Sequence, residues 1–142
     1  MSRALLDVNV LLAVFDPDHV DHSAARGWLA AHLEFGWASC ALTENGFVRV
    51  LSQPRYPHPV PPGRAVQLLE RARASDHEFW DCALSLTDPT AVDRDRLHGP
   101  QQVTDVYLLA LAVRHGGRLV TFDRTVPLSA APGATSQHLV VL

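Results

Sequence analysis

A chain of 142 residues, 47% of them hydrophobic and 19% charged, has room for one compact core, so we expect a single domain over residues 1–142. Its 12 basic and 15 acidic residues give a net charge of −3, which excludes nucleic-acid binding through bulk positive charge but leaves local phosphate contacts open. All the basic residues are arginines, which excludes chemistry that needs a lysine amine, such as Schiff-base formation or a P-loop lysine.

The cysteines and the N-terminal residues indicate a reducing, cytoplasmic setting. Cys40 and Cys82 are far apart and neither belongs to a CxxC pair, so we expect no zinc site and no disulfide framework. Asp7 interrupts the apolar stretch after Arg3, which argues against a signal peptide. The apolar run over residues 106–113 is far shorter than the ~18 residues that would suggest a membrane span. We therefore expect a cytoplasmic protein with no membrane contact.

Strands and helices are predicted to alternate in the first third of the chain, where short apolar runs give way to helical spacing of the apolar residues. In chain order these elements are a strand over residues 4–6, a helix over 9–15, a helix over 20–35, a strand over 37–42 and a helix over 43–51. The segment over 52–63 contains five prolines, which neither a helix nor a central strand accommodates, so it is predicted to be a stiff surface loop.

The same alternation continues after the proline-rich loop. The predicted elements are a helix over 64–74, a strand over 78–86, a helix over 89–97, a helix over 104–115 and strands over 118–122 and 138–142. The helix over 89–97 is predicted from Asp88-Pro89, an N-cap followed by proline at the first helical position. Strands separated by helices indicate an α/β fold with a mostly parallel central sheet.

Four acidic residues fall where this arrangement places the carboxyl ends of the strands. Asp7 and Asp123 follow predicted strands, and Glu44 and Asp105 open predicted helices. Ligands of open α/β sheets gather at that edge. We therefore expect all four carboxylates to face one cleft.

Each acid also has an ordinary explanation. Asp7 could cap the following helix, Glu44 and Asp105 could complement the positive end of a helix, and Asp123 could be a turn residue. None of these roles explains why four charges share one edge, where a pair ~4 Å apart repels by about 4 kcal/mol at an effective dielectric constant of 20. A bound cation would offset that repulsion, and oxygen ligands favour Mg²⁺ or Mn²⁺ over Zn²⁺. The predicted chemistry is metal-assisted hydrolysis of a phosphate ester.

The residues around the four acids resemble the PIN-domain ribonucleases, specifically the VapC-type toxins of bacterial toxin–antitoxin systems. The resemblance spans the whole chain and is carried by Leu5-Leu6-Asp7-Val8-Asn9, Thr43-Glu44-Asn45-Gly46-Phe47, Val103-Thr104-Asp105-Val106-Tyr107-Leu108-Leu109-Ala110 and Leu119-Val120-Thr121-Phe122-Asp123. The chain departs from the pattern after Asp123, where residues 124–127 lack the aromatic side chain that such proteins often have.

The resemblance implies a three-layer α/β/α PIN-like domain that acts as a metal-dependent endoribonuclease toxin. It implies that the acidic cluster binds Mg²⁺ or Mn²⁺, with Asp7 and Asp105 as the most direct ligands. The implied site residues are Asp7, Glu44, Asp105 and Asp123, supported by Asn9 and Thr121. The implied partners are RNA as substrate, a cognate antitoxin protein, and a second copy of the chain in a homodimer, for which helices 20–35 and 64–74 could supply a face.

A different class of function stays open, namely a non-catalytic PIN-fold module that binds RNA or protein. The complete set of four acids favours catalysis. The candidate RNA contacts near the motifs or in loops are Arg49, Arg55, Arg94, Arg96 and Arg124, each of which is also explained as an ordinary solvated arginine. The eight histidines are scattered and are interpreted as ordinary polar residues rather than general bases.

Overall fold

A five-stranded sheet forms the centre of the molecule in the computed structural model, which describes residues 2–142. Its strands are β1 (Ala4–Leu6), β2 (Trp37–Cys40), β3 (His77–Trp80), β4 (Arg118–Thr121) and β5 (Leu139–Val141). They lie in the order β3-β2-β1-β4-β5, and every neighbouring pair is parallel. The predicted parallel sheet is confirmed, with the N-terminal strand at its centre.

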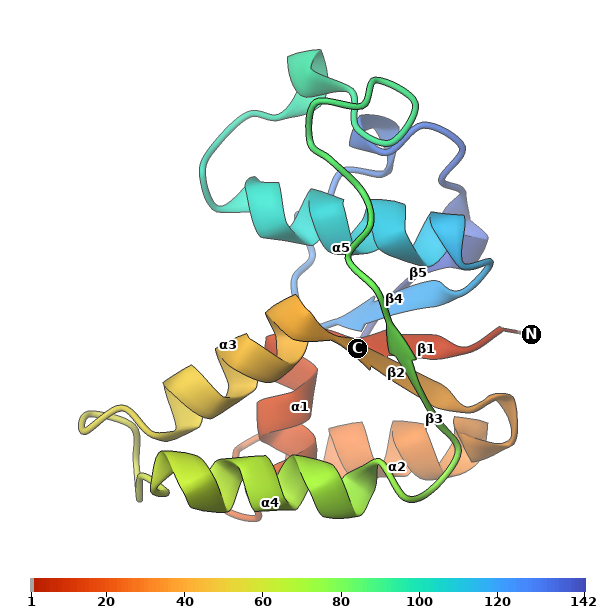
Figure 1. The fold of residues 1–142 in the computed structure, drawn as a ribbon. Helices are drawn as coiled ribbons and strands as arrows, with labels where there is room; N and C mark the ends of the chain where they lie inside the picture. The colour runs from red at the N-terminus through yellow and green to blue at the C-terminus, as the bar shows by residue number, and fades with distance from the viewer. Residues whose placement is uncertain (1) are drawn as a thin grey trace.

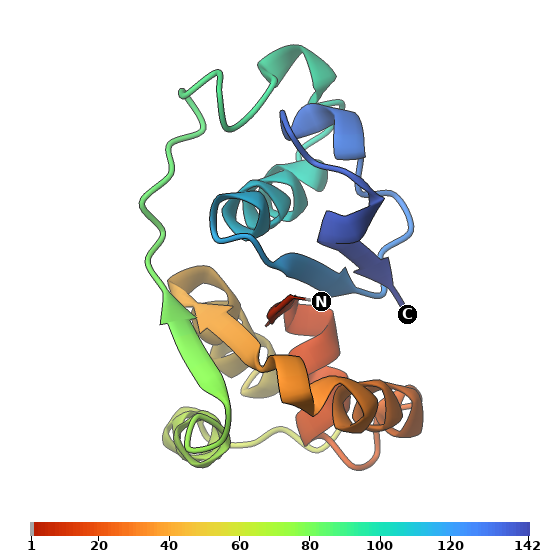
Figure 2. The ribbon, with the colours of Figure 1, turned by 90° about the vertical axis from the view of Figure 1, so that its right-hand side faces the viewer.

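Helices cover both faces of this sheet (Figure 1). The helices are α1 (Val8–Phe15), α2 (His22–His32), α3 (Ala41–Leu51), α4 (Pro62–Ala72) and α5 (Gln102–Arg114). One core joins one face of the sheet to α1, α2, α3 and α4, and the other core joins the opposite face to α5. Figure 2 shows α5 on one side of the strands and α1, α2 and α4 on the other. This is the expected three-layer α/β/α arrangement.

Burial explains the composition of the central elements. All three residues of β1 are buried because the sheet is covered on both faces, and such strands consist of continuous apolar residues. Most of α5 is also buried on all sides, from Val106 to Ala112. Neither Cys40 nor Cys82 is in a disulfide, as expected. Within residues 2–142, no helix has both the length and the apolar character needed to cross a membrane.

The strand predicted over 78–86 is too long. Strand β3 runs only from His77 to Trp80, and residues 81–85 have no regular structure. The cause lies in the neighbouring strand, because Trp80 pairs with Cys40, the last residue of β2, and α3 begins at Ala41. Beyond Trp80 the chain therefore has no strand to pair with.

The helix predicted over 89–97 is wrong. The structure has turns there and a short 3₁₀ helix over Arg94–Arg96. Side chains compete for the backbone donors: Asp88 Oδ1 accepts from Thr90 N at 2.9 Å and Asp93 Oδ1 from Asp95 N at 3.1 Å. Such local bonds offer the backbone an alternative to the helical ladder.

Several further boundaries differ from the prediction by a few residues. Strand β2 ends at Cys40 rather than at residue 42, α4 begins at Pro62 rather than at residue 64, and α5 begins at Gln102 rather than at residue 104. Helix α3 begins at Ala41 rather than at Thr43, because the Thr43 hydroxyl lies 3.0 Å from the Cys40 amide and forms a capping box with Cys40. The helix predicted over 20–35 is divided into α2 and a 3₁₀ turn over Leu33–Phe35.

Gly46 allows α3 to approach α1 closely at the carboxyl edge of the sheet. A Cβ atom at this position would lie 2.6 Å from Val8 Cγ2, on the residue that follows Asp7. We expect Gly46→Ala to lower the free energy of unfolding by about 1–3 kcal/mol, because α3 must move to relieve the overlap. Urea unfolding monitored by circular dichroism measures the change.

Gly27→Ala is the matched control. Gly27 lies in α2 with nothing within 4 Å of the added Cβ, so the change should raise stability by about 0.5–1 kcal/mol. Equal stability changes in the two variants would contradict a close contact between α1 and α3 at Gly46.

Candidate active site

The four predicted acids occupy the expected positions in the fold. Asp7 directly follows β1, and Asp123 comes two residues after β4. Glu44 and Asp105 lie in the first turns of α3 and α5. These are the ends of elements at the carboxyl edge of the sheet, where parallel α/β folds bind their ligands.

Asp7 is the most buried of the four, with 7% of its surface exposed. Its Oδ1 atom accepts a hydrogen bond from Val8 N at 2.7 Å, so it caps α1, and its Oδ2 atom accepts one from Thr121 Oγ1 at 2.8 Å. Burial raises the pKa of Asp7, the two hydrogen bonds lower it, and the charge of Asp123 raises it further. The net effect is a pKa above the ordinary value, so desolvation outweighs the hydrogen bonds.

The hydroxyl of Thr121 joins β4 to the residues around Asp7. This fully buried side chain donates to Asp7 and accepts from Asn9 Nδ2 at 3.2 Å and from the amide of Asp123 at 3.0 Å. Asn9 Oδ1 in turn accepts from the amide of Phe122 at 3.3 Å. The structure thus places both predicted supporting residues in contact with the aspartates or with the backbone that holds them.

Asp105 and Asp123 interact with each other, and their pKa values shift in opposite directions. Burial, the charge of Asp7, and a hydrogen bond and charge interaction with Asp123 raise the pKa of Asp105 to about 7. The pKa of Asp123 is lowered, mainly because its Oδ1 atom accepts from Thr125 Oγ1 at 2.7 Å and from Thr125 N at 2.8 Å. Near neutral pH, Asp105 is therefore the acid of the pair that takes up a proton more readily, and Asp123 stays ionised.

Glu44 has a different set of partners. Its Oε2 atom accepts from Ser39 Oγ at 2.6 Å and forms an ion pair with Arg73 Nη1 at 3.3 Å. Glu44 is not among the charges that shift the pKa values of Asp7, Asp105 and Asp123. The structure therefore brings the three aspartates into electrostatic contact and holds the fourth acid against Arg73.

Ser39, Arg73 and His77 are residues of the site that the sequence did not reveal. His77 Nε2 lies 2.7 Å from Ser39 Oγ. Because the Ser39 hydroxyl gives its single proton to Glu44, His77 Nε2 must carry the proton of the second bond. Burial and the nearby Arg73 lower the pKa of His77, which favours the neutral ring. The sequence signal for this network is one polar residue, Ser39, within the otherwise apolar segment that forms β2.

Carboxylate oxygens are suitable ligands for a hard divalent cation. Within residues 2–142, no three His, Cys, Asp or Glu side chains stand close enough to hold one metal ion together. Mg²⁺ commonly keeps several waters and takes only one or two protein carboxylates, so the Asp105–Asp123 pair beside Asp7 provides a fitting donor set. A cation bound there would displace the proton of Asp105 and offset the negative charge of the neighbouring carboxylates.

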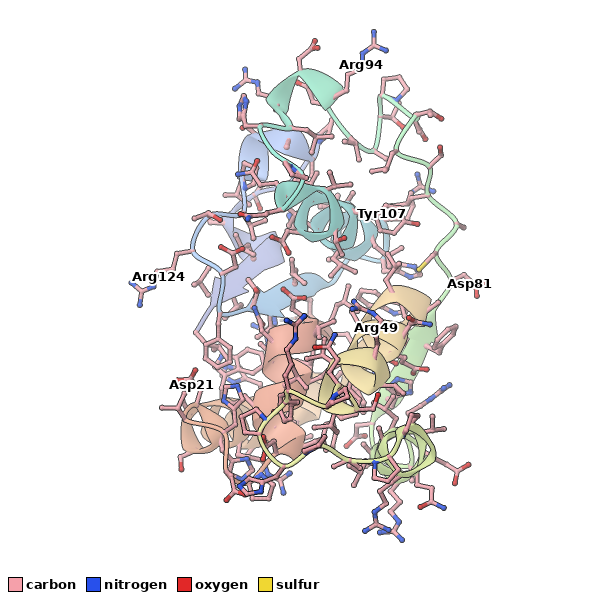
Figure 3. The ribbon with its side chains drawn as sticks, turned by 90° about the vertical axis from the view of Figure 1, so that its left-hand side faces the viewer. Asp21, Arg49, Asp81, Arg94, Tyr107 and Arg124 are labelled. Atoms are coloured by element: carbon pink, nitrogen blue, oxygen red, sulfur yellow. The ribbon has the colours of Figure 1, made fainter. Side chains whose placement is uncertain are left out.

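The candidate RNA-contacting arginines differ in their distance from this edge (Figure 3). Arg94 and Arg124 extend outward at the margins of the molecule, whereas Arg49 lies on α3 near the middle of the face. Arg49 and Arg73 both line a pocket that includes Glu44.

Comparisons with known proteins agree with the fold and with the sequence motifs. The family model described as "PIN domain" matches residues 4–131. Ribonuclease VapC44 of Mycobacterium tuberculosis is 62% identical over 141 residues, which cover 99% of each protein. Ribonuclease VapC39 of the same species is 42% identical over 132 residues, which cover 92% of this chain and 95% of the relative.

Solved structures share the fold at low sequence identity. The match to DNA-bound VapBC from Salmonella typhimurium has a TM-score of 0.59 at 15% identity and covers 99% of this chain and 98% of the other. The match to VapBC2 from Rickettsia felis, bound to a promoter DNA fragment, has a TM-score of 0.56 at 12% identity and covers 84% and 87% of the two chains.

The raised pKa of Asp105 predicts that Asp105→Asn stabilises the metal-free protein at high pH. The folded wild type holds a proton up to a pKa of about 7, whereas the unfolded chain loses it near pH 4. The wild type therefore loses stability as pH rises between these values, and the variant does not. We expect Asp105→Asn to be more stable at pH 8 by on the order of 1–2 kcal/mol, a value reduced by solvent screening of this partly exposed carboxyl.

Chemical unfolding in EDTA at pH 5 and pH 8 tests this prediction. The advantage of the variant should shrink at the lower pH, and Asp95→Asn, on the exposed 3₁₀ helix, should show no such dependence. A variant that is less stable than wild type at pH 8 would mean that Asp105 acts chiefly as a helix-end residue.

Proposed function

This chain belongs to the PIN-domain family and is of the VapC type, and we propose that it hydrolyses RNA with a divalent cation held by Asp105 and Asp123 beside Asp7. The single observation that carries the proposal is the position of Asp105 and Asp123 beside the buried carboxylate of Asp7 at the carboxyl edge of the sheet. Burial and the neighbouring charges raise the pKa values of Asp7 and Asp105, which costs stability at neutral pH, and a bound cation would offset that cost.

The side chains have separate tasks in this proposal. Asp105 and Asp123 would hold the cation in place of the Asp105 proton, and the buried Asp7 would contribute further negative charge beside them. Thr121 and Asn9 fix Asp7 and the start of the loop that carries Asp123. When bound, Mg²⁺ or Mn²⁺ supplies charge neutralisation at the phosphate and makes a nucleophile available near neutral pH.

The partners follow from the family. Ribonuclease is the printed name of the relatives with high identity, and the solved VapBC structures are complexes. We propose that RNA is the substrate of this chain, that a cognate antitoxin inhibits it and that it acts in the cytoplasm. We further propose that the chain forms a homodimer, with a face supplied by α2 and α4.

RNA cleavage should require Mg²⁺ or Mn²⁺ and should be lost in EDTA. Asp7→Asn and Asp105→Asn should each reduce the cleavage rate by at least about 100-fold, because each removes a charge that the cation needs. Gel analysis of total RNA after incubation with purified protein measures the loss, with melting temperatures to show that the variants are folded.

Asp95→Asn serves as the control, since Asp95 is exposed and lies outside the three-aspartate group. Full RNA cleavage in EDTA, or an undiminished cleavage rate for Asp105→Asn, would contradict the metal mechanism. Tight RNA binding without cleavage at any metal concentration would favour the non-catalytic module.

The antitoxin proposal predicts a small inhibitor encoded by the gene adjacent to this one. Co-expression of that gene product should suppress the growth arrest that this chain causes alone, and the two proteins should purify together. A neighbouring product that neither binds nor inhibits the chain would remove the support for this partner.

A further inference from the structure

A pocket of about 970 Å³ lies between α3, α4 and β3, and Glu44 is one of the residues that line it. Apolar side chains from three elements form much of its wall: Val48 from α3, Val66 and Leu69 from α4, and Phe79 from β3. Phe79 is 41% exposed and Val66 53% exposed, so both present apolar surface to any molecule that enters. The size is within the range of pockets that bind small molecules or single residues of a polymer.

Arg73 lines this pocket beside Glu44. Its guanidinium carbon is 5.1 Å from the centre of the Phe79 ring, and its Nη1 atom is 3.3 Å from Glu44 Oε2. The side chain is 40% exposed, so a ligand can reach it. The pocket therefore combines an accessible aromatic ring with an arginine that already binds an anion.

We propose that this pocket, defined by Glu44, Val48, Val66, Leu69, Arg73 and Phe79, binds one unpaired nucleotide of the RNA next to the cleaved phosphate, with its base stacked on Phe79 and its phosphate on Arg73. The inference rests on the proposed function, because the pocket includes residues from the start of α3, at the carboxyl edge of the sheet where the three aspartates also lie. Bases stack on aromatic side chains and on arginine planes, and arginine binds phosphate through paired donors.

The charges around the pocket favour a nucleotide over an apolar peptide. Arg49, Arg73, Glu44 and Glu70 all line the pocket, and the partly exposed guanidinium of Arg73 already binds a carboxylate there. An RNA phosphate can compete with Glu44 for this guanidinium. An apolar side chain has no acceptor to offer it. The exposed amide of Asn45, also in the wall, can bind a base edge.

The test measures RNA binding without cleavage. Fluorescence anisotropy with a labelled short single-stranded RNA in EDTA should show that Phe79→Ala weakens binding by about tenfold, whereas Phe79→Trp retains it. Arg73→Gln should weaken binding by a similar factor and reduce its salt dependence by about one phosphate contact. In Mg²⁺, Phe79→Ala should also change the relative use of cleavage sites in a mixed-sequence RNA.

The controls are changes of the same kind elsewhere. Val141→Ala alters an apolar residue of equal exposure on β5. Arg114→Gln removes an exposed arginine that is also paired with a carboxylate, Asp88, and that lies in the last turn of α5 outside the pocket. Both variants should bind RNA as the wild type does. Unchanged melting temperatures show that Phe79→Ala and Arg73→Gln are folded.

Three results bear on the proposal in different ways. Normal RNA binding and unchanged cleavage sites in Phe79→Ala and Arg73→Gln would overturn it. Normal RNA binding combined with lost inhibition by a protein partner would also overturn it and would assign the pocket to a peptide. Phe79-dependent binding by a wild type that cleaves no RNA would support the nucleotide site and refute the nuclease function instead.

Discussion

The carboxylate of Asp7, buried at the end of the central strand, joins the parts of the molecule on which the candidate site depends. It ends β1, caps α1 through Val8 and ties β4 to β1 through the Thr121 hydroxyl. The same hydroxyl holds the amide of Asp123, so the position of one buried acid determines where the next acid lies. An ionised group in this position is costly because water cannot solvate it, and its raised pKa reflects that cost.

The charge of Asp7 also affects the ionisation of Asp105. Burial, followed by the charge of Asp7 and the interaction with Asp123, raises the pKa of Asp105 to about 7. A protein under selection for stability alone would not keep three acids in this arrangement. Residues that lower stability at one edge of a fold are characteristic of binding and catalytic sites. Glu44 avoids the same repulsion because Arg73 neutralises it.

Much of this arrangement could be predicted from the chain itself. Alternating apolar runs and helical spacing placed the strands and helices, and the parallel topology then placed Asp7, Asp105 and Asp123 at one edge. Each of these acids also has a local structural role. Asp7 is a helix cap, Asp105 lies in the first turn of a helix and Asp123 is a turn residue. These roles are compatible with a role in the site. Asp7 caps α1 and still faces the other two aspartates.

The remaining features depend on contacts between distant residues, which periodicity does not reveal. Strand β3 ends at Trp80 because this residue pairs with Cys40, the last residue of β2, which lies far away in the sequence. The ion pair of Glu44 with Arg73 and the bond of Ser39 to His77 likewise require β3 and α4 to be placed beside α3. His77 was therefore interpreted as an ordinary histidine, and the four acids were expected in one cleft.

The protonation of Asp105 beside Asp123 allows the most direct test of a metal site at these aspartates. Isothermal titration of Mn²⁺ into the protein, in buffers of different ionisation enthalpy, counts the protons released on binding. At about pH 6 most molecules hold the Asp105 proton, so the account predicts release of nearly one proton per ion, falling toward zero at about pH 8.5. Absence of Mn²⁺ binding, binding without proton release at pH 6, or equal release by Asp105→Asn would contradict it.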